Sequence, residues 1–142
     1  MSYESLSHSR FDCKYHVVFI PHCRKKVLFG KIREFLGPKF HELANQKGCK
    51  IIQGGICLDH VHMLITIPPK YSVSEVIGYI KGKAAIAVAR QFSGRKQNFN
   101  GEKMWARGYA VSTVGFNEEQ IRDYVKNQET LDNQQQFGNG NF

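Results

Sequence analysis

The stretch "CKIIQGGICLDHVHMLITI", residues 49–67, decides the fold, because it holds two strand-forming segments joined by a very short link. The segments "CKIIQGGICL" and "HVHMLITI" are rich in apolar β-formers, and their closeness in sequence predicts a β-hairpin. Gly54 and Gly55 predict a bulge or a close approach of another group to the backbone. Side chains alternate along a strand, so one face of the second segment is apolar, with Val61, Met63, Ile65 and Ile67. The opposite face carries His60, His62, Leu64 and Thr66.

A strand and a helix precede this hairpin. The segment "KYHVVFI", residues 14–20, is β-branched and aromatic and stops at Pro21, which predicts a strand. Apolar residues at helical spacing then predict a helix from about Lys31 or Arg33 to Lys47, with Gly48 as its stop. Pro38 falls inside this range, and we expect it to kink the helix or delay its start.

Two helices and a strand follow the hairpin. The segment "SVSEVIGYIKGKAAIAVARQF", residues 72–92, has a period near 3.6 and offers Ser72 or Ser74 as a cap. A polar loop over 93–103 leads to the strand "GYAVSTV", residues 108–114, and to the helix "NEEQIRDYVKNQETL", residues 117–131. Asn117, with Gln120 three residues later, predicts a capping box.

The predicted order is strand, helix, strand, strand, helix, strand, helix. Two split βαβ units in this order form an α+β fold, a ferredoxin-like (RRM-like) antiparallel sheet with two helices on one face. The third helix is then available to cover the other face, which carries His60 and His62. We expect one domain over residues 1–131 and a mobile tail over 132–142, where apolar periodicity is lost.

Net charge, apolar content and cysteine spacing indicate which kinds of partner and compartment to expect. A net charge of +8 on 142 residues favours a polyanionic partner, and nucleic acid is the first candidate, although each basic cluster alone is equally compatible with a solvated face. The longest apolar runs fall far short of the roughly 20 residues that span a bilayer, so no membrane partner is expected. No export signal is evident at the start, so a cytoplasmic protein is expected. The four cysteines lack C-x-x-C spacing, which favours buried thiols over a disulfide framework or a structural zinc site.

Two groups of residues are candidates for chemistry. His60 and His62 lie two apart on a strand, within reach of one divalent ion, although a solvated or hydrogen-bonded pair is the alternative. On the last helix, Tyr124 and Gln128 lie one turn apart in the inward-facing stripe that Ile121 and Val125 begin. A tyrosine oxygen can act as a nucleophile and a glutamine oxygen can complete a metal shell; alternatively, both are ordinary residues of an amphipathic helix.

These residues resemble a known family. The segment "DHVHMLITIPP", residues 59–69, resembles the HUH motif (histidine, hydrophobic residue, histidine) of the single-tyrosine transposases of the bacterial insertion sequence 200/605 group. The segment "YVKNQ", residues 124–128, is similar to their catalytic tyrosine with a glutamine four residues later. Further similarity lies in "KYHVVFIPHCRKK", "YIKGKAA" and "WARGYAVSTV", so the resemblance covers roughly residues 11–131.

The resemblance implies a homodimeric DNA transposase that cuts and rejoins single-stranded DNA near hairpins at the ends of an insertion sequence. It implies that Tyr124 attacks the scissile phosphate, and that His60, His62 and Gln128 hold Mg²⁺ or Mn²⁺. We expect DNA backbone contacts from five basic residues, Arg24, Lys25, Lys26, Lys81 and Lys83. The alternatives are a domesticated or replication-type HUH nickase and a noncatalytic RRM-like nucleic-acid-binding module, which would expose aromatic side chains on its central strands.

Overall fold

A four-stranded antiparallel sheet organises the structure. The computed structural model describes residues 4–5, 10–24, 27–92 and 104–135, and its sheet has the strand order β4-β5-β3-β6. Two interlocked split βαβ units produce this order, so the predicted α+β, ferredoxin-like fold is confirmed. The elements are β1 (Glu4–Ser5), β2 (Arg10–Phe11), β3 (Lys14–Phe19), η1 (His22–Arg24), α1 (Gly30–Gln46), β4 (Lys50–Ile56), β5 (Val61–Thr66), α2 (Val73–Gln91), β6 (Ala110–Ser112) and α3 (Glu118–Gln135).

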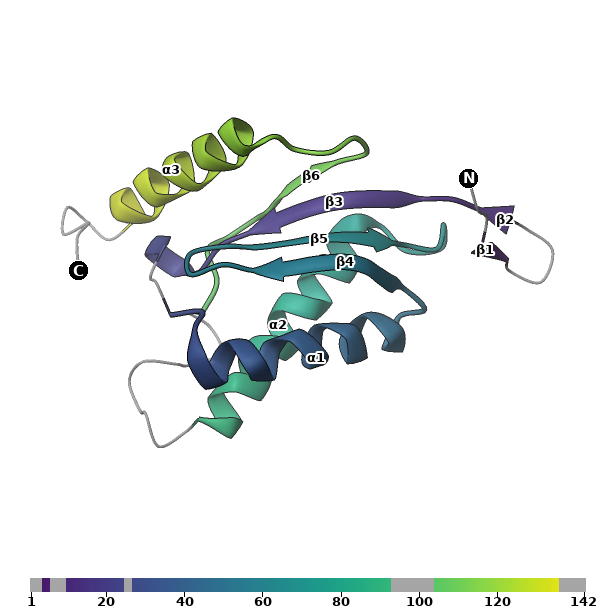
Figure 1. Cartoon of the computed structure of the whole chain (residues 1–142), viewed down its shortest axis with the longest axis horizontal. Coiled ribbons are helices and arrows are strands. Elements are labelled where there is room, and N and C mark those ends of the chain that lie inside the picture. The colour runs from purple at the N-terminus through teal and green to yellow at the C-terminus, as the bar shows by residue number, and fades with distance from the viewer. Residues whose placement is uncertain (1–3, 6–9, 25–26, 93–103, 136–142) are drawn as a thin grey trace.

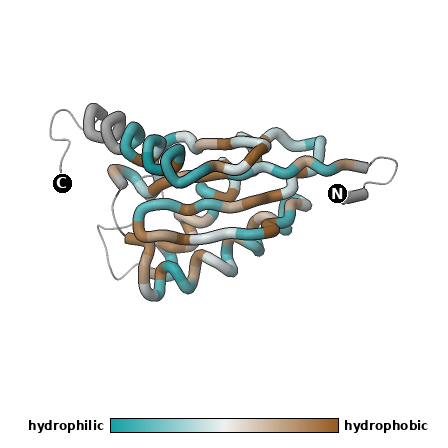
Figure 2. Tube along the Cα trace, turned by 45° about the horizontal axis from the view of Figure 1, so that its top comes forward, coloured by the Kyte–Doolittle hydropathy of each residue, from teal (hydrophilic) through white to brown (hydrophobic). Residues whose placement is uncertain are grey.

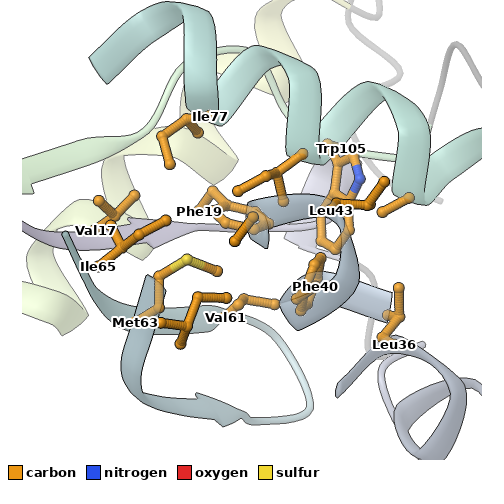
Figure 3. Packing of buried hydrophobic residues seen from close by; sticks show 14 of the residues in the cluster. Val17, Phe19, Leu36, Phe40, Leu43, Val61, Met63, Ile65, Ile77 and Trp105 are labelled. Atoms are coloured by element: carbon orange, nitrogen blue, oxygen red, sulfur yellow. The ribbon is translucent and has the colours of Figure 1, made fainter. Parts of the chain in front are cut away.

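The main core lies between the sheet and the helices α1 and α2, while α3 lies over the opposite face (Figure 1). Phe19 of β3 makes edge-to-face contacts with Trp105 and Phe40, with ring centroids 4.9 and 5.9 Å apart (Figure 3). Each such aromatic pair stabilises by about 0.5–1.5 kcal/mol beyond its buried area. These rings join the strands to α1 and to the segment before β6.

The register of β5 determines which of its residues face away from this core. The residues that face it are buried and apolar, namely Val61, Met63 and Ile65. On the other face, His16 pairs with Leu64 and Val18 pairs with His62 across the β3–β5 ladder. A slip of one residue would exchange the two faces, so the buried side chains of β5 hold His62 on the outer face. The prediction that one face of this strand is apolar and faces the core, while the other carries His62 and Leu64, is confirmed.

The helix α3 packs on the outer face through a small apolar cluster. Ile121, Tyr124 and Val125 of α3 pack with Ile20 and Ala106, and this cluster is separate from the main core. The described part of α3 is otherwise mostly hydrophilic (Figure 2). Among the side chains of α3 that the structure describes, through Gln128, few apolar contacts hold the helix on the sheet.

The capping box predicted for α3 is confirmed, and of the two caps offered for α2, Ser72 is the one used, within a capping box that was not predicted. In α2, Ser72 Oγ accepts from the backbone N–H of Glu75, and the Glu75 carboxylate accepts from the backbone N–H of Ser72, each at 3.0 Å. In α3, Asn117 Oδ1 accepts from Gln120 N–H at 2.8 Å, and Gln120 Oε1 accepts from Asn117 N–H at 2.9 Å. Each box satisfies two backbone donors that the first turn of a helix would otherwise leave unpaired.

Pro38 does not delay the start of α1, which begins at Gly30 and continues through it. Proline removes the bond to the carbonyl of Glu34, but both residues are exposed, so water can reach that carbonyl. The predicted stop is confirmed: Gly48 adopts φ +70°, and the N–H of Cys49 reaches back to the carbonyl of Ala44 at 2.9 Å. A left-handed glycine in this position is a common helix terminator.

Two features differ from the sequence-based expectations or extend them. The short β1–β2 ladder was not predicted, because two-residue strands carry no periodicity. The helix α3 continues to Gln135, four residues beyond the predicted end at Leu131. The rest of the expected tail, 136–142, and the polar loop 93–103 lie outside the described residues. Within the described part of the chain, no helix combines the length and apolar character needed to cross a membrane.

Candidate functional site

The two histidines lie at the start of β5, directly after the tight turn that joins it to β4. The N–H of Cys57 donates to the carbonyl of His60 at 2.8 Å, which closes the hairpin over Leu58 and Asp59. His60 and His62 then point to the same side of the sheet, with ring centroids 5.7 Å apart and planes inclined by 40°. The predicted side-by-side arrangement is confirmed, and the hairpin itself sets its geometry.

Gly55 makes room for the ring of His62. The two residues are cross-strand partners, and a Cβ atom built on Gly55 would lie 2.3 Å from Nε2 of His62. Gly54 has no such constraint, because its added Cβ would meet its nearest atoms at 3.6 Å. The close approach predicted for this glycine pair is thus found at Gly55, while the bulge occurs earlier, between Ile51 and Gln53.

Asp59 fixes the orientation of His60. Its Oδ1 lies 3.0 Å from Nδ1 of His60, so Nε2 is the ring nitrogen that this contact leaves for a metal ion. A carboxylate behind a histidine is a common support for a metal ligand, since it sets the ring orientation and raises the basicity of the free nitrogen. Sequence reasoning passed over Asp59, although its position directly before the first histidine was visible.

Electrostatics favour neutral imidazole at His62. Packing of the ring removes part of its hydration, and this desolvation lowers the pKa of His62 below its ordinary value. The neighbouring His60 lowers that pKa further, because two positive charges would repel each other. Neutral imidazole is the form that binds a metal ion, so both effects favour ligation.

A third metal-ligating group lies beside the histidines. The sulfur of Cys57 and one nitrogen from each of His60 and His62 all lie within 4.8 Å of one another. Sequence reasoning assigned Cys57 to the buried thiols, but its side chain is exposed. Only the hairpin turn, which sets Cys57 opposite His60, reveals the grouping.

Tyr124 lies on α3 beside the end of β3. Its side chain packs with Ile20. In the antiparallel β3–β5 ladder Phe19 pairs with Val61, so the next residue of β3's segment, Ile20, lies beside His60. Ile20 therefore adjoins both the tyrosine helix and the histidine strand. The hydroxyl oxygen of Tyr124 is buried in this arrangement.

Gln128 is oriented by a backbone carbonyl. Its side-chain Nε2 donates to the carbonyl oxygen of Arg107 at 3.0 Å, and no described residue donates to Oε1, the acceptor of the carboxamide. Arg107 itself belongs to a segment held by Lys81, whose Nζ donates to the carbonyls of Ala106 and Gly108 at 2.9 and 2.7 Å. The predicted stripe Ile121, Tyr124, Val125 and Gln128 thus faces the protein, while the side chain of Leu131 lies outside the description.

Two cavities border His62. One of about 350 Å³ lies between the outer sheet face and the start of α3, against His16, Leu64 and Phe116. The other, of about 490 Å³, lies between β4 and α1, against Arg33 and His41. The histidine strand is therefore accessible from two sides.

The five basic residues predicted to contact DNA have different surroundings. Lys81 is engaged by two carbonyls, as described above, and Lys83 has its ammonium 5.8 Å from the ring centre of Tyr79. Arg24 ends η1, but its side chain is not described, and Lys25 and Lys26 lie outside the described residues. Both lysines of α2 are therefore tied to neighbouring groups in the isolated chain.

Comparison with known proteins places the chain in a family. The family model "Transposase IS200 like" matches residues 9–128. The transposase of insertion sequence element IS200 from Salmonella typhimurium is 42% identical over 125 residues, which are 88% of this chain and 82% of the relative. The ISDra2 transposase TnpA from Deinococcus radiodurans is 26% identical over 119 residues, 83% of this chain and 85% of the relative.

Solved structures show the same fold. A candidate transposase from Deinococcus radiodurans R1 matches with a TM-score of 0.75 at 23% identity, covering 88% of this chain and 97% of the other. A REP-associated tyrosine transposase, solved with a REP hairpin, matches with a TM-score of 0.54 at 15% identity, covering 84% of this chain and 68% of the other. The resemblance drawn from the sequence motifs is therefore confirmed, and the chain belongs to the family of IS200-like transposases.

Proposed function

We propose that this transposase cleaves and rejoins single-stranded DNA at the ends of its insertion sequence through a 5′-phosphotyrosine intermediate. The observation that carries the proposal is the joint position of His60 and His62 on the outer sheet face, next to the helix that bears Tyr124. A noncatalytic RRM-like module fits less well, because the outer face of the central strands presents His16, Val18, His62 and Leu64 and no phenylalanine, tyrosine or tryptophan on which bases could stack.

The residues present fit a divalent metal ion. His60 and His62 offer donors in mutual reach, Asp59 supports one ring, and Gly55 leaves space for the other. We propose that these histidines and Gln128 Oε1 hold Mg²⁺ or Mn²⁺, the mixed nitrogen and oxygen set that Mn²⁺ accepts more readily than Mg²⁺. When bound, such an ion supplies Lewis-acid stabilisation of charge on the phosphate oxygens.

Tyr124 is the proposed nucleophile. Its Oη forms a bond to the scissile phosphorus while the bond from phosphorus to the 3′ oxygen breaks; the phenol loses a proton and the 3′ oxygen gains one. One phosphodiester replaces another and the bond energy is retained, so rejoining needs no nucleoside triphosphate. Because the Tyr124 hydroxyl is buried, either its side chain or α3 as a whole has to move before a phosphate can reach it. The small apolar cluster that holds α3 supports such a movement.

The net charge and the family membership indicate the proposed partners, which are single-stranded DNA and a second copy of the chain. A net charge of +8 suits a nucleic acid, and the cavity of about 350 Å³ beside His62 offers space for an unpaired nucleotide. We propose that the DNA carries a hairpin near each end of the element, that two copies of the chain act together because excision needs two cuts, and that the reaction takes place in the cytoplasm. The REP-associated relative, solved with a hairpin, is consistent with this substrate class.

A covalent-adduct assay tests the proposal. Labelled single-stranded oligonucleotides that span the element's ends are incubated with protein in Mn²⁺ or EDTA and resolved on denaturing gels. The expected result is an adduct that needs the metal, disappears in Tyr124→Phe and His62→Ala, and persists in Tyr79→Phe. Tyr79 is a matched control, because it lies on α2 and hydrogen-bonds to Gln46. Tight DNA binding without an adduct under any metal would overturn the proposal.

A further inference from the structure

The β4–β5 turn brings a thiol to the histidine pair. Gly55 pairs with His62 and Ile56 pairs with Val61, so Cys57 follows directly opposite His60. Alternation along the two strands then sets Gly55, Cys57, His60 and His62 on one face, with no side chain at the glycine. The sulfur and the two imidazole nitrogens lie within 4.8 Å of one another.

A Cys-His-His set has a different metal preference from a set of two histidines and a glutamine. Thiolate and imidazole suit Zn²⁺ and Co²⁺, whereas Mg²⁺ and Ca²⁺ prefer oxygen donors. Tetrahedral zinc, with bonds of about 2.0–2.3 Å, sets its ligand atoms roughly 3.3–3.7 Å apart, so no pair of the three donors needs to approach by more than about 1.5 Å. Cys57 is exposed, so its side chain can rotate toward the rings while the hairpin stays closed.

We propose that Cys57, His60 and His62 form a binding site for Zn²⁺ in which the thiolate is the third protein ligand. Three protein ligands leave one tetrahedral position open, as in catalytic zinc sites. Binding releases the thiol proton to solvent. Asp59 supports His60 in this site as well, through the contact between Oδ1 and Nδ1.

The site has a regulatory consequence that rests on the proposed function. Zn²⁺ held by Cys57 shares both histidines with the Mg²⁺ or Mn²⁺ of strand cleavage, so the two metals exclude each other. Zinc bound on the Cys57 side of the pair lies toward the hairpin turn, whereas Gln128, the proposed third ligand of the cleavage metal, belongs to α3. Zinc is therefore an inhibitor of cleavage that acts by capturing the two histidines.

Cobalt spectroscopy tests the ligand set without any activity measurement. Co²⁺ is added to the metal-free full-length protein, and thiolate-to-cobalt charge transfer is followed in the near ultraviolet. Wild type and Cys13→Ser should show the band, Cys57→Ser should lose it, and His62→Ala should need more cobalt to reach it. Cys13 is a matched control, because it is a free cysteine outside the cluster. A wild-type spectrum without the band, or a band that survives in Cys57→Ser, would overturn the site.

Zinc affinity and inhibition complete the test. Zn²⁺ should protect Cys57, but not Cys13, from alkylation as measured by peptide mass spectrometry, and equal protection of both would count against the site. In reactions where Mn²⁺ supports adduct formation, each variant's adduct yield is measured relative to its own yield without zinc. The zinc concentration that halves this yield should be at least about tenfold higher for Cys57→Ser than for wild type, because loss of even a residue that only supports a metal ligand weakens binding by that much. If no variant forms an adduct, the proposed function fails, while the cobalt and alkylation results still decide the zinc site.

Discussion

The imidazole of His62 lies over Gly55, so closely that a Cβ atom at residue 55 would be 2.3 Å from Nε2. Gly55→Ala should therefore displace the ring and weaken Mn²⁺ binding by at least about tenfold, as expected when the support of a metal ligand is lost. Isothermal titration calorimetry with Mn²⁺ measures the effect. Gly54→Ala is the matched control, because its added Cβ meets no atom closer than 3.6 Å. Equal affinity in the two variants would show that the ring position does not depend on Gly55.

Lys81 of α2 holds the segment before β6 through hydrogen bonds to its backbone. Its ammonium donates to the carbonyls of Ala106 and Gly108, while its own carbonyl accepts from the indole N–H of Trp105 at 3.0 Å. Lys81→Met should lower the free energy of unfolding by about 1–3 kcal/mol, because two carbonyls lose a charged donor. Lys83→Met, which removes only an ammonium stacked near Tyr79, should cost less than about 1 kcal/mol.

Urea unfolding of the two lysine variants measures this difference. If Lys81 instead acts mainly on DNA, Lys81→Met would leave the unfolding midpoint unchanged and would reduce the salt dependence of DNA binding. The prediction from the sequence that Lys81 contacts DNA remains untested.

The cysteines should differ in reactivity according to burial. Burial raises the pKa of Cys49 to about 11, and the charge of Lys47 opposes this only in part. A raised pKa means less thiolate at a given pH, so native Cys49 should resist iodoacetamide near pH 8 while the exposed Cys57 reacts. Peptide mass spectrometry after timed labelling reports both. Equal labelling rates in the native protein would contradict the burial of Cys49.

The lowered pKa of His62 predicts a pH dependence with a definite sign. Because desolvation and then the charge of His60 lower this pKa, His62 stays neutral to a lower pH than an ordinary histidine, and metal binding persists further into acid. The unfolded chain takes up the proton more readily, so stability from this group is complete above the unfolded pKa and is lost as pH falls through the folded value.

An NMR titration of His62 checks the cause. His60→Gln removes one of the two effects, so it should raise the pKa of His62 toward its ordinary value while leaving the desolvation. An unchanged or lower pKa in this variant would contradict the proposed repulsion between the rings. The metal has to be absent during the titration, because ligation competes with the proton.

The hairpin shows how far the sequence determined the fold. Alternating apolar residues from Val61 to Ile67 predicted both the strand and its buried face. A cap at Ser72 or Ser74 and a capping box at Asn117 predicted two helix starts. These signals are local, since they depend on residues within one turn or one strand. The small β1–β2 ladder and the last turn of α3 lack such signals, so they were missed.

The site was predictable only in part, for the same reason. The histidine pair and the Tyr124–Gln128 spacing are visible along the chain. The grouping of Cys57 with the histidines depends on the tight turn, and the support of Gln128 by Arg107 joins segments that are distant in sequence. Pro38 shows the converse. It was expected to kink the helix or delay its start, but α1 begins at Gly30 and continues through the proline, which is exposed.

The most direct test of the central claim is to map the covalent bond between protein and DNA. Adduct formed in Mn²⁺ is digested with protease and nuclease, and the remaining nucleotide–peptide is sequenced by mass spectrometry. The account predicts a 5′-linked nucleotide on the peptide that contains Tyr124, together with a free 3′-hydroxyl on the released strand. A nucleotide attached to any other residue, or linked through its 3′ end, would contradict it.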